Sequence, residues 1–205
     1  MTARPLIISD CDEVLLHFVT PFEAYLQSVH TLTLRLDSFA LTGNIRRGDG
    51  AAVPATEFMP LLDGFFDTHM PTQTAAPGAV DSLATLAGYC DIVILTNLAD
   101  RYNAPRTAEL ARLGMPYRVV TNHGPKGAPV AALVAEYGPT AAVFIDDLPP
   151  HHSAVREAAP AVYRLHMVAD PKLQSLIPAS ADADVRIDRW PDALTHIERW
   201  LENRR

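Results

Sequence analysis

The sequence predicts an α/β protein built on a parallel β-sheet, and three observations lead to this fold class. Apolar runs alternate with helical patterns from Leu6 to the end of the chain, once residues 17–76 are set aside. The runs are short and bounded by polar residues, which is typical of strands buried on both faces of a parallel sheet. The 205 residues, 48% of them apolar, suffice for one substantial core. These features predict strand–helix–strand crossovers and a sheet covered by helices on both faces.

The first predicted strand is the apolar run Leu6–Ile8, and two aspartates follow it closely. Asp10 and Asp12 stand two positions apart before apolar sequence resumes. In parallel sheets, ligands bind just beyond the carboxyl ends of the strands. Carboxylates are rarely buried unless they are paired or bound to a metal, so this pair is a candidate site. For these two residues alone, a strand-end turn is the alternative.

Residues 17–76 interrupt the alternation and predict a small, mostly helical insertion. Thr20 and Pro21 suit the N-cap and the first position of a helix, and apolar residues follow them at helical spacing. A second helix is predicted over Glu57–His69, and the Gly-rich, charged stretch Gly43–Gly50 predicts an exposed loop. No segment of the insertion resembles a strand that could join the parallel sheet.

From Pro77 onward, strands and helices alternate regularly. The predicted strands are Asp91–Thr96, Tyr117–Val120, Ala141–Ile145, Val162–His166 and Val185–Ile187. The predicted helices are Ala79–Tyr89, Arg101–Leu113, Lys126–Tyr137, His151–Ala158 and Pro191–Asn203. Gly114 and Gly138 follow two of these helices, as glycines that end a helix do.

Three apolar strands end in polar groups that suit phosphate chemistry. These groups are Asp10 and Asp12, then Thr96 and Asn97, then Asp146 and Asp147. Lys126 stands between the last two groups, at the start of a predicted helix. Each motif alone is weak, because a hydroxyl at a strand end is common and a lone lysine is usually solvated. Four motifs in order, each at a strand end or helix start, are a strong signal.

The order of an Asp-x-Asp motif, a Thr, a Lys and an acidic pair resembles the motif order of the haloacid dehalogenase-like (HAD) superfamily. The resemblance covers essentially the whole chain. It implies a Rossmann-like parallel sheet flanked by helices, with a small helical cap inserted after the first strand. The core domain would comprise residues 1–16 and 77–205, and the cap would comprise residues 17–76.

The resemblance also implies catalytic roles. Asp10 would attack phosphorus and form an aspartyl-phosphate, since carboxylates are known nucleophiles in covalent catalysis. Asp12 would protonate the leaving oxygen and later take a proton from water. Thr96 and Lys126 would hold the phosphoryl oxygens, with Lys126 offsetting the developing negative charge. Asn97, next to Thr96, is a further candidate for contact with the substrate.

Several carboxylates facing a phosphate require a cation, and Mg²⁺ fits this ligand chemistry. By the resemblance, the ligands would be the Asp10 side chain, the Asp12 backbone carbonyl and Asp147. Asp146 would orient Lys126 or a metal-bound water. Which of Asp146 and Asp147 contacts the metal directly stays open.

Two positions depart from the family pattern. The residue after the second aspartate is usually small, but here it is Glu13, in the turn that leads to the insertion. Glu13 either faces the substrate or is a solvated carboxylate, and the solvated carboxylate is favoured. Many members carry a further acid four residues after the metal-binding aspartate, whereas this chain has His151 there. We interpret His151 and the adjacent His152 as the solvated start of a helix.

Other candidates lie in the insertion. Arg46 and Arg47 either grip an anionic substrate or belong to an exposed loop, and the loop is favoured. His17, Phe18 and Phe22 are expected to line the pocket, because they stand where the chain enters the insertion.

The leading functional prediction is a Mg²⁺-dependent phosphatase, a phosphoric monoester hydrolase that acts on a small phosphorylated metabolite; a nucleoside monophosphate is one candidate. A dehalogenase of the same superfamily is disfavoured, because it normally lacks the second aspartate, which is present here as Asp12. A phosphonate hydrolase lacks it too and needs a lysine in its cap, whereas residues 17–76 contain no lysine. A phosphomutase of the same superfamily stays open. A receiver-like signalling domain is disfavoured, because its acidic pair precedes the phosphorylated aspartate and its lysine comes last, whereas the acidic pair comes last here. A non-catalytic phosphate-binding protein is disfavoured too, because it would not need the full set of motifs.

Bulk properties limit the partners. The formal net charge of -7 argues against nucleic acid as a partner, since nucleic-acid binders usually carry a basic patch. No apolar window reaches the roughly 18 residues that a membrane span requires, and no signal peptide is evident. Two cysteines without metal-ligand spacing imply neither a disulfide framework nor a zinc site. A cytoplasmic protein, monomer or homodimer, is expected.

Overall fold

The computed structural model describes residues 3–36 and 40–204, and its centre is a six-stranded parallel sheet. The strand order is β5-β4-β1-β6-β7-β8, so the first strand lies in the interior of the sheet. Its strands are β1 (Leu6–Ser9), β4 (Asp91–Thr96), β5 (Arg118–Thr121), β6 (Ala142–Asp146), β7 (Tyr163–His166) and β8 (Val185–Arg186). The predicted α/β class is therefore confirmed, and each predicted strand is present within two residues of its expected bounds.

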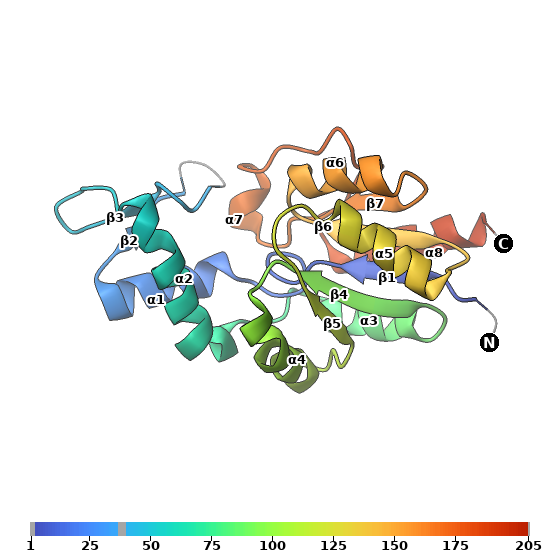
Figure 1. The fold of residues 1–205 in the computed structure, drawn as a ribbon, viewed down its shortest axis with the longest axis horizontal. Coiled ribbons are helices and arrows are strands. Elements are labelled where there is room, and N and C mark those ends of the chain that lie inside the picture. The colour runs from blue at the N-terminus through green and yellow to red at the C-terminus, as the bar shows by residue number, and fades with distance from the viewer. Residues whose placement is uncertain (1–2, 37–39, 205) are drawn as a thin grey trace.

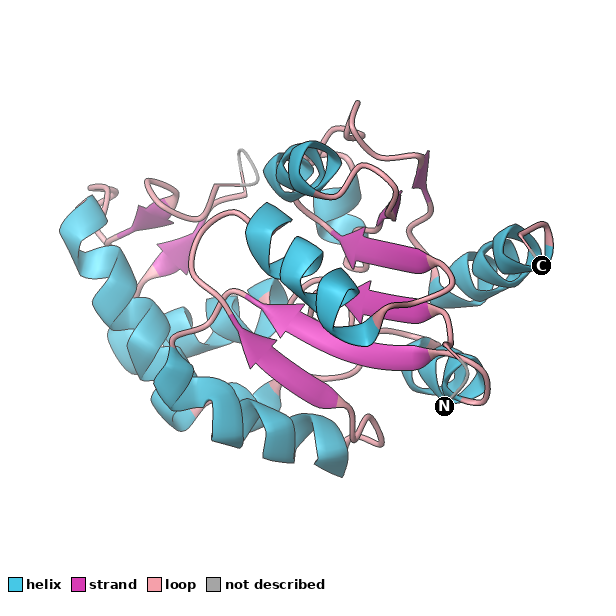
Figure 2. Cartoon of the chain, turned by 45° about the vertical axis from the view of Figure 1, so that its right-hand side comes forward, coloured by secondary structure: helices cyan, strands magenta, loops and turns pink. Residues whose placement is uncertain are grey.

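Alternate residues of the strands face two different helical layers, as the pleat of a strand requires. Ile7 of β1 packs in one apolar cluster, whereas Leu6 and Ile8 pack in another. The first layer consists of α3 (Ala79–Ala87), α4 (Asn103–Arg112) and α8 (Trp190–Glu202). The second layer consists of α5 (Gly127–Tyr137) and α6 (Pro149–Ala158). Figure 2 shows helices on both sides of the sheet, which explains why the central strands β1, β4 and β6 are apolar except at their ends.

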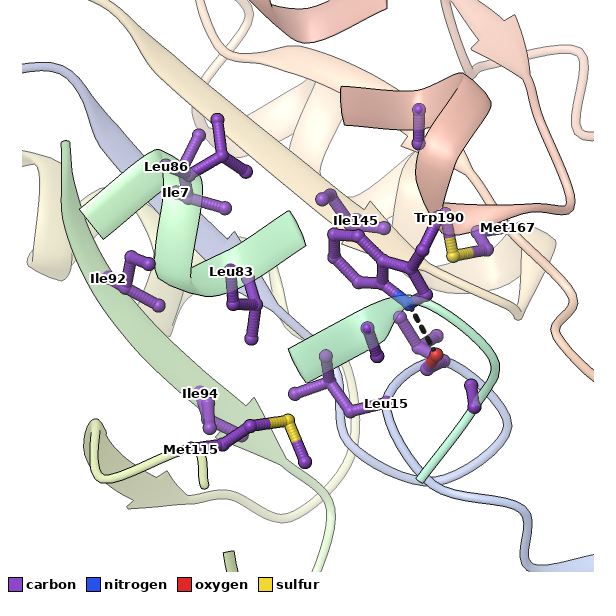
Figure 3. Close-up of a cluster of buried hydrophobic side chains, with 14 of the residues drawn as sticks. Ile7, Leu15, Leu83, Leu86, Ile92, Ile94, Met115, Ile145, Met167 and Trp190 are labelled. Atoms are coloured by element: carbon purple, nitrogen blue, oxygen red, sulfur yellow. Dashed lines mark hydrogen bonds between the residues drawn. The ribbon is translucent and has the colours of Figure 1, made fainter. Parts of the chain in front are cut away.

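The last long helix, α8, is tied to the loop that follows β1. The Trp190 side chain, at the start of α8, is almost fully buried among Leu15, Ile145 and Met167 (Figure 3). Its indole Nε1 donates a hydrogen bond of 2.8 Å to the backbone carbonyl of Val14. Two parts of the chain that are far apart in sequence thus support the same loop.

The segment of residues 17–76, called the cap segment below, lies beside the sheet (Figure 1). It contains α1 (Val19–His30), α2 (Ala55–Thr68), a short 3₁₀ helix (Met70–Thr72) and two short strands. The strands β2 (Thr33–Leu34) and β3 (Ile45–Arg46) pair with each other in antiparallel fashion and form a separate sheet. The sequence did not predict this hairpin, since its strands are only two residues long.

Aromatic rings hold the two cap helices together. Phe18 and Phe22 stack with ring centroids 5.2 Å apart, and Phe65 of α2 meets both rings edge to face. These arrangements are the ones that aromatic quadrupoles favour. The residues belong to a third apolar cluster, which also includes Leu173 and Ile177 from the segment after β7.

Some predicted boundaries were wrong. Helix α1 begins at Val19 rather than after a Thr20 N-cap, and its N-cap position is Phe18. Helix α6 begins at Pro149, because prolines suit the first turn of a helix, so His151 lies inside it. The short helix α7 (Pro171–Gln174) was not predicted. Among the described residues, no helix is long and apolar enough to cross a membrane.

Candidate active site

The predicted polar groups converge at the carboxyl edge of the parallel sheet. Strand β1 lies between β4 and β6, so their three carboxyl ends are neighbours. Asp10 follows β1, Thr96 ends β4 and Asp146 ends β6. Lys126 occupies the N-cap position of α5, after β5. This edge is where parallel sheets bind their ligands.

Lys126 joins two of these carboxylates. Its Nζ atom lies 2.6 Å from Oδ1 of Asp10 and 2.7 Å from Oδ2 of Asp146. All three side chains are buried, with only 1% of the lysine side chain exposed. The next residue, Gly127, allows Lys126 to lie at the sheet edge. A Cβ atom at residue 127 would lie 2.3 Å from the backbone oxygen of Ala154 in α6. The α5 N-terminus can therefore pack closely against α6 and bring Lys126 to the sheet edge.

The carboxylates exceed the local positive charge. Burial raises the pKa of Asp10 to about 7, although the charge of Lys126 opposes the shift. Burial also raises the pKa of Asp147 well above its usual value, and the charges of Asp146 and Asp10 add to the effect. Burial acts in the same direction on Asp146, but Lys126 outweighs it and keeps the pKa of that carboxyl low. One lysine thus does not neutralise the three acids.

This donor set fits a divalent cation. Carboxylate oxygens of Asp10, Asp146 and Asp147 lie within 4.8 Å of one another, and all three residues are buried. Hard cations such as Mg²⁺ prefer oxygen ligands and bind through one or two carboxylates. A buried excess of carboxylate charge is costly unless it is paired or bound to a metal, so these residues fit a divalent cation.

A second acidic group is occupied by structural contacts. Atoms of Glu13, His17 and Asp170 also lie within 4.8 Å of one another. However, Asp170 caps α7 by accepting the backbone N–H of Lys172, and it also accepts the hydroxyl of Thr20. Glu13 is engaged by the start of α1. These contacts account for the group without a metal.

Asp12, the second aspartate of the motif, is held by two side chains that the sequence argument missed. Nη2 of Arg106 lies 3.1 Å and 3.3 Å from its two carboxylate oxygens. Gln73 donates its Nε2–H to Oδ1 of Asp12 over 2.6 Å. The guanidinium of Arg106 is fully buried and lies 5.5 Å from the centre of the Phe66 ring. One signal was present: Arg106 and Leu110 share a face of α4, so an arginine stands where an apolar residue is expected.

The interpretation of Glu13 as a solvated carboxylate was wrong. Glu13 is 4% exposed, and its Oε1 atom accepts the backbone N–H groups of Phe18 and Val19 at 2.8 Å and 2.6 Å. Its φ of 61° lies in the left-handed region, where a glycine or another small residue is easily accommodated. At Glu13, the loop after β1 therefore has the backbone conformation that a glycine at this position would favour. Burial raises the pKa of Glu13 to about 7.

The two histidines after the acidic pair are not a solvated helix start. His152 is fully buried, and its Nε2 atom lies 3.0 Å from the backbone oxygen of Asp146. Burial lowers the pKa of His152 to about 4, so the ring is neutral at pH 7. His151 is half-buried, and its Nε2 atom lies 3.3 Å from Nδ2 of Asn97. His151 therefore faces the site, and His152 supports the end of strand β6.

A cavity of about 350 Å³ opens over this edge of the sheet. Its floor includes Asp10, Asp12, Thr96, Lys126 and Asp147, and Asn97 and His151 line its side. Its remaining wall comes largely from apolar side chains of the cap segment. The volume lies in the range of typical small-molecule pockets. Asp146 does not line the cavity, but it contacts Lys126 from behind.

Of the residues expected to line the pocket from the insertion, only one lines this cavity. Phe18 does so, whereas Phe22 is fully buried in the aromatic cluster and His17 lines other surface hollows. Arg46 and Arg47 also lie outside the cavity lining, so they do not grip a substrate there. The predicted exposed loop over Gly43–Gly50 was wrong in part, because Ile45 and Arg46 form the strand β3 and Ile45 is buried. Arg47 instead forms an ion pair of 2.7 Å with Glu57.

Comparisons with known proteins reveal similarity in fold. No protein-family model matches this sequence, and no curated protein matches it significantly. A Burkholderia xenovorans protein described as a haloacid dehalogenase-like hydrolase is 20% identical, with a TM-score of 0.62 and coverage of 98% of this chain and 99% of that one. A predicted phosphoglycolate phosphatase from Haemophilus somnus is 16% identical, with a TM-score of 0.65 and coverage of 96% and 99%. YfnB from Bacillus subtilis, described as a HAD-hydrolase bound to magnesium, is 14% identical, with a TM-score of 0.65 and coverage of 96% and 99%.

These matches extend over nearly the whole of both chains. At 14–20% identity the likeness concerns the fold rather than the substrate. The chain has the fold of haloacid dehalogenase-like hydrolases, as its motif order predicted.

Proposed function

We propose that this chain is a Mg²⁺-dependent phosphatase of the haloacid dehalogenase-like superfamily that hydrolyses a small phosphorylated metabolite. The observation that carries the proposal is the buried cluster of Asp10, Lys126, Asp146 and Asp147 at the carboxyl edge of the sheet. Phosphoryl transfer depends mainly on positioning and charge stabilisation, and this cluster offers a nucleophile, a cation and metal ligands together.

In the proposed first step, a carboxylate oxygen of Asp10 forms a bond to phosphorus, and the bond from phosphorus to the leaving oxygen breaks. Asp12 donates a proton to that oxygen, so the alcohol leaves neutral. Lys126 and the Thr96 hydroxyl hold the phosphoryl oxygens while negative charge develops on them.

In the second step, a water oxygen attacks phosphorus and Asp12 takes a proton from that water. The bond between phosphorus and Asp10 breaks, which releases inorganic phosphate and restores both carboxyl groups. Asp12 serves as acid and then as base, and its fixed contacts with Arg106 and Gln73 keep it in place for both steps.

Asp10, Asp147 and the backbone carbonyl of Asp12 would hold Mg²⁺. When bound, the ion would balance the charge of the carboxylates and of the phosphoryl oxygens. Asp146 then keeps Lys126 oriented by the contact of 2.7 Å.

The cap segment would act as a cap over this site, with residues 1–16 and 77–205 as the core domain. The cavity supports this division, since side chains from both regions line it. A cap that excludes bulk water and bulky substrates favours small molecules over phosphoproteins.

The proposal is tested by hydrolysis of 4-nitrophenyl phosphate and a panel of small phosphomonoesters, with Mg²⁺ and with a chelator. Activity that needs Mg²⁺ and falls at least about 10³-fold in Asp10→Asn is expected. In the wild type, an aspartyl-phosphate that survives acid quenching, and that borohydride reduces to homoserine with loss of phosphate, is also expected. Asp192→Asn, which changes a carboxylate on the surface of α8, is the matched control and keeps full activity.

Activity that survives in Asp10→Asn would exclude Asp10 as the nucleophile. Conversion of one sugar phosphate into its isomer, without release of inorganic phosphate, would assign a phosphomutase instead.

A further inference from the structure

We propose that the substrate of this site is a monoester whose phosphate is its only charged group and whose organic part is an apolar aryl or alkyl group. The inference rests on the proposed phosphatase function and specifies its substrate class. The evidence for this substrate class is the chemistry of the side chains that line the cavity above the sheet edge.

The side of the cavity opposite the carboxylates is apolar. Phe58, Leu62 and Phe66 of α2 line it, together with Leu41 of the cap segment. Leu173 and Ile177, which follow β7, close it from the side of the core. Burial of an apolar group against such walls is favourable, at about 25 cal/mol per Å² of apolar surface.

In the described lining of the cavity, the charged side chains come from the loop after β1, from the start of α5 and from the end of β6. Among the described residues that line the cavity, the charged side chains are Asp10, Asp12, Glu13, Lys126 and Asp147. The single cation, Lys126, is already shared between Asp10 and Asp146. A substrate carboxylate or second phosphate would therefore lie beside apolar walls and other carboxylates. An unpaired charge at such a position is costly.

The cap segment contains three arginines, Arg35, Arg46 and Arg47, and none of them lines the cavity. Nη1 of Arg46 donates to the backbone oxygen of Gly43, and Arg47 pairs with Glu57. The segment of residues 17–76 contains no lysine. The cap segment thus brings no basic side chain to the described lining of the cavity.

Polar partners for a sugar are also few. Outside the charged cluster, the uncharged polar side chains of the described lining are Thr96, Asn97 and His151. The Asn97 amide already donates to the backbone oxygen of Gly124 and accepts from Asn122. A polyol would leave hydroxyl groups without partners against the apolar wall, and each such group costs free energy.

The wall is suited to a flat apolar group. The rings of Phe18 and Phe66, both in the lining, stack with their centroids 5.6 Å apart and their planes 15° apart. Phe18 is in turn fixed edge to face by Phe65. Such an arrangement presents a rigid aromatic surface to an aryl or alkyl group.

The test compares benzyl phosphate with 4-carboxybenzyl phosphate, which differ in one carboxylate and leave similar alcohols. In the wild type with Mg²⁺, kcat/KM is expected to be at least about 30-fold higher for benzyl phosphate. Leu62→Arg places a cation in the apolar wall and is expected to reduce this ratio at least tenfold. Leu62 is half-exposed, so the helix tolerates the longer side chain.

Met59→Arg is the matched control. Met59 lies on the same helix, is 55% exposed and does not line the cavity, so the same new charge is expected to leave the ratio unchanged. Binding of both esters to the Asp10→Asn variant, measured by calorimetry, gives the same comparison without turnover.

Equal kcat/KM for the two esters, or preferred hydrolysis of phosphoglycolate or a sugar phosphate, would overturn the inference and leave the phosphatase function standing. Tighter binding of benzyl phosphate by the Asp10→Asn variant, with no ester hydrolysed by the wild type, would support the inferred cavity and contradict the phosphatase function. Equal binding of both esters without hydrolysis would overturn both.

Discussion

Arg106 is a single residue on which the geometry of the site depends. Its guanidinium is fully buried, and its charge faces Asp12. Removal of one partner from a buried ion pair leaves an uncompensated charge, which typically costs ~3–5 kcal/mol. The pair also fixes the direction of the Asp12 carboxylate, because Gln73 holds the same oxygen from the cap segment. We therefore treat Arg106 as a positioning residue for the proposed acid–base group.

The first prediction concerns this pair. Arg106→Lys keeps the charge but loses the contacts of Nη2 with both Asp12 oxygens. Hydrolysis of alkyl phosphates is therefore expected to fall by roughly 10²-fold, in line with the usual contribution of general acid–base catalysis. Esters with good leaving groups need less protonation, and 4-nitrophenyl phosphate is expected to lose less than tenfold. Steady-state kinetics with both substrates measure the difference. Arg112→Lys, an exposed change on the same helix, is the control, and an equal loss with both substrates would contradict the positioning role.

The second prediction concerns Mg²⁺ and pH. Because the pKa of Asp10 is raised to about 7, a proton occupies this carboxyl below pH 7 and must leave before a cation binds. Affinity for Mg²⁺ is therefore expected to be about tenfold weaker at pH 6 than at pH 8 and to level off above about pH 8. Calorimetric titration in buffers of different ionisation enthalpy measures both the affinity and the released proton. An affinity that does not change between pH 6 and pH 8 would contradict the site.

Sequence reasoning placed the strand-end residues of the site, because a residue after a parallel strand is directed to one edge by topology alone. It did not find Arg106 or Gln73, since their contacts with Asp12 depend on how α4 and the cap segment pack. It also placed Glu13 in solvent. A buried glutamate is an exception to the general rule for charged residues, and only its hydrogen bonds to backbone N–H groups explain it.

At the scale of elements, the start of α1 is stabilised from outside the helix. Its N-cap residue, Phe18, has no side-chain acceptor, and Glu13 from the loop after β1 supplies the missing oxygen. The same loop residue accepts the first N–H group of the helix, from Val19. The cap segment is thereby joined to the loop that carries Asp10 and Asp12.

The third prediction separates the two roles of Glu13. Glu13→Ala removes the acceptor and keeps a Cβ atom at φ 61°, so the free energy of unfolding is expected to fall by about 2 kcal/mol. Glu13→Gly loses the same acceptor but adopts this φ easily, and it is expected to be about 1 kcal/mol more stable than the alanine variant. Urea unfolding of both variants measures the difference. Equal stabilities would show that the backbone conformation contributes nothing.

Elements of the core were predictable from sequence because the central strands β1, β4 and β6 are apolar runs with polar residues only at their ends, and the helices have an apolar face. The hairpin of β2 and β3 was not, since strands of two residues leave no period to detect. The same holds for α7, with four residues. The exact start of α1 also escaped prediction, because its cap comes from Glu13 and not from an adjacent residue.

At the scale of the whole molecule, the parallel sheet and its two helical layers fix the site, and the cap segment completes the cavity. Trp190 links the C-terminal helix α8 to the loop after β1 through its hydrogen bond to the Val14 carbonyl. The indole is 1% exposed, so this hydrogen bond is shielded from water.

The fourth prediction concerns this link. Trp190→Phe keeps much of the apolar contact but leaves the Val14 carbonyl without its donor, which is expected to lower the free energy of unfolding by roughly 1–3 kcal/mol. Activity per folded molecule is also expected to fall, because the loop after Asp12 loses a fixed point. Thermal unfolding and kinetics below the transition measure the two effects. Trp200→Phe, a change at a half-buried site on the same helix, is the comparison, and equal effects would contradict a special role for Trp190.

The interior position of β1 has a consequence for the synthesis of the chain. β1 leaves the ribosome before both of its neighbours, which pair with it from Asp91 and from Ala142 onward. At ~5–20 residues per second, the second neighbour follows on the order of ten seconds later. During this interval the apolar strand that precedes the proposed nucleophile has an unpaired edge. An unpaired strand edge favours aggregation, so a chaperone that covers β1 during this interval is expected to raise the yield of folded protein.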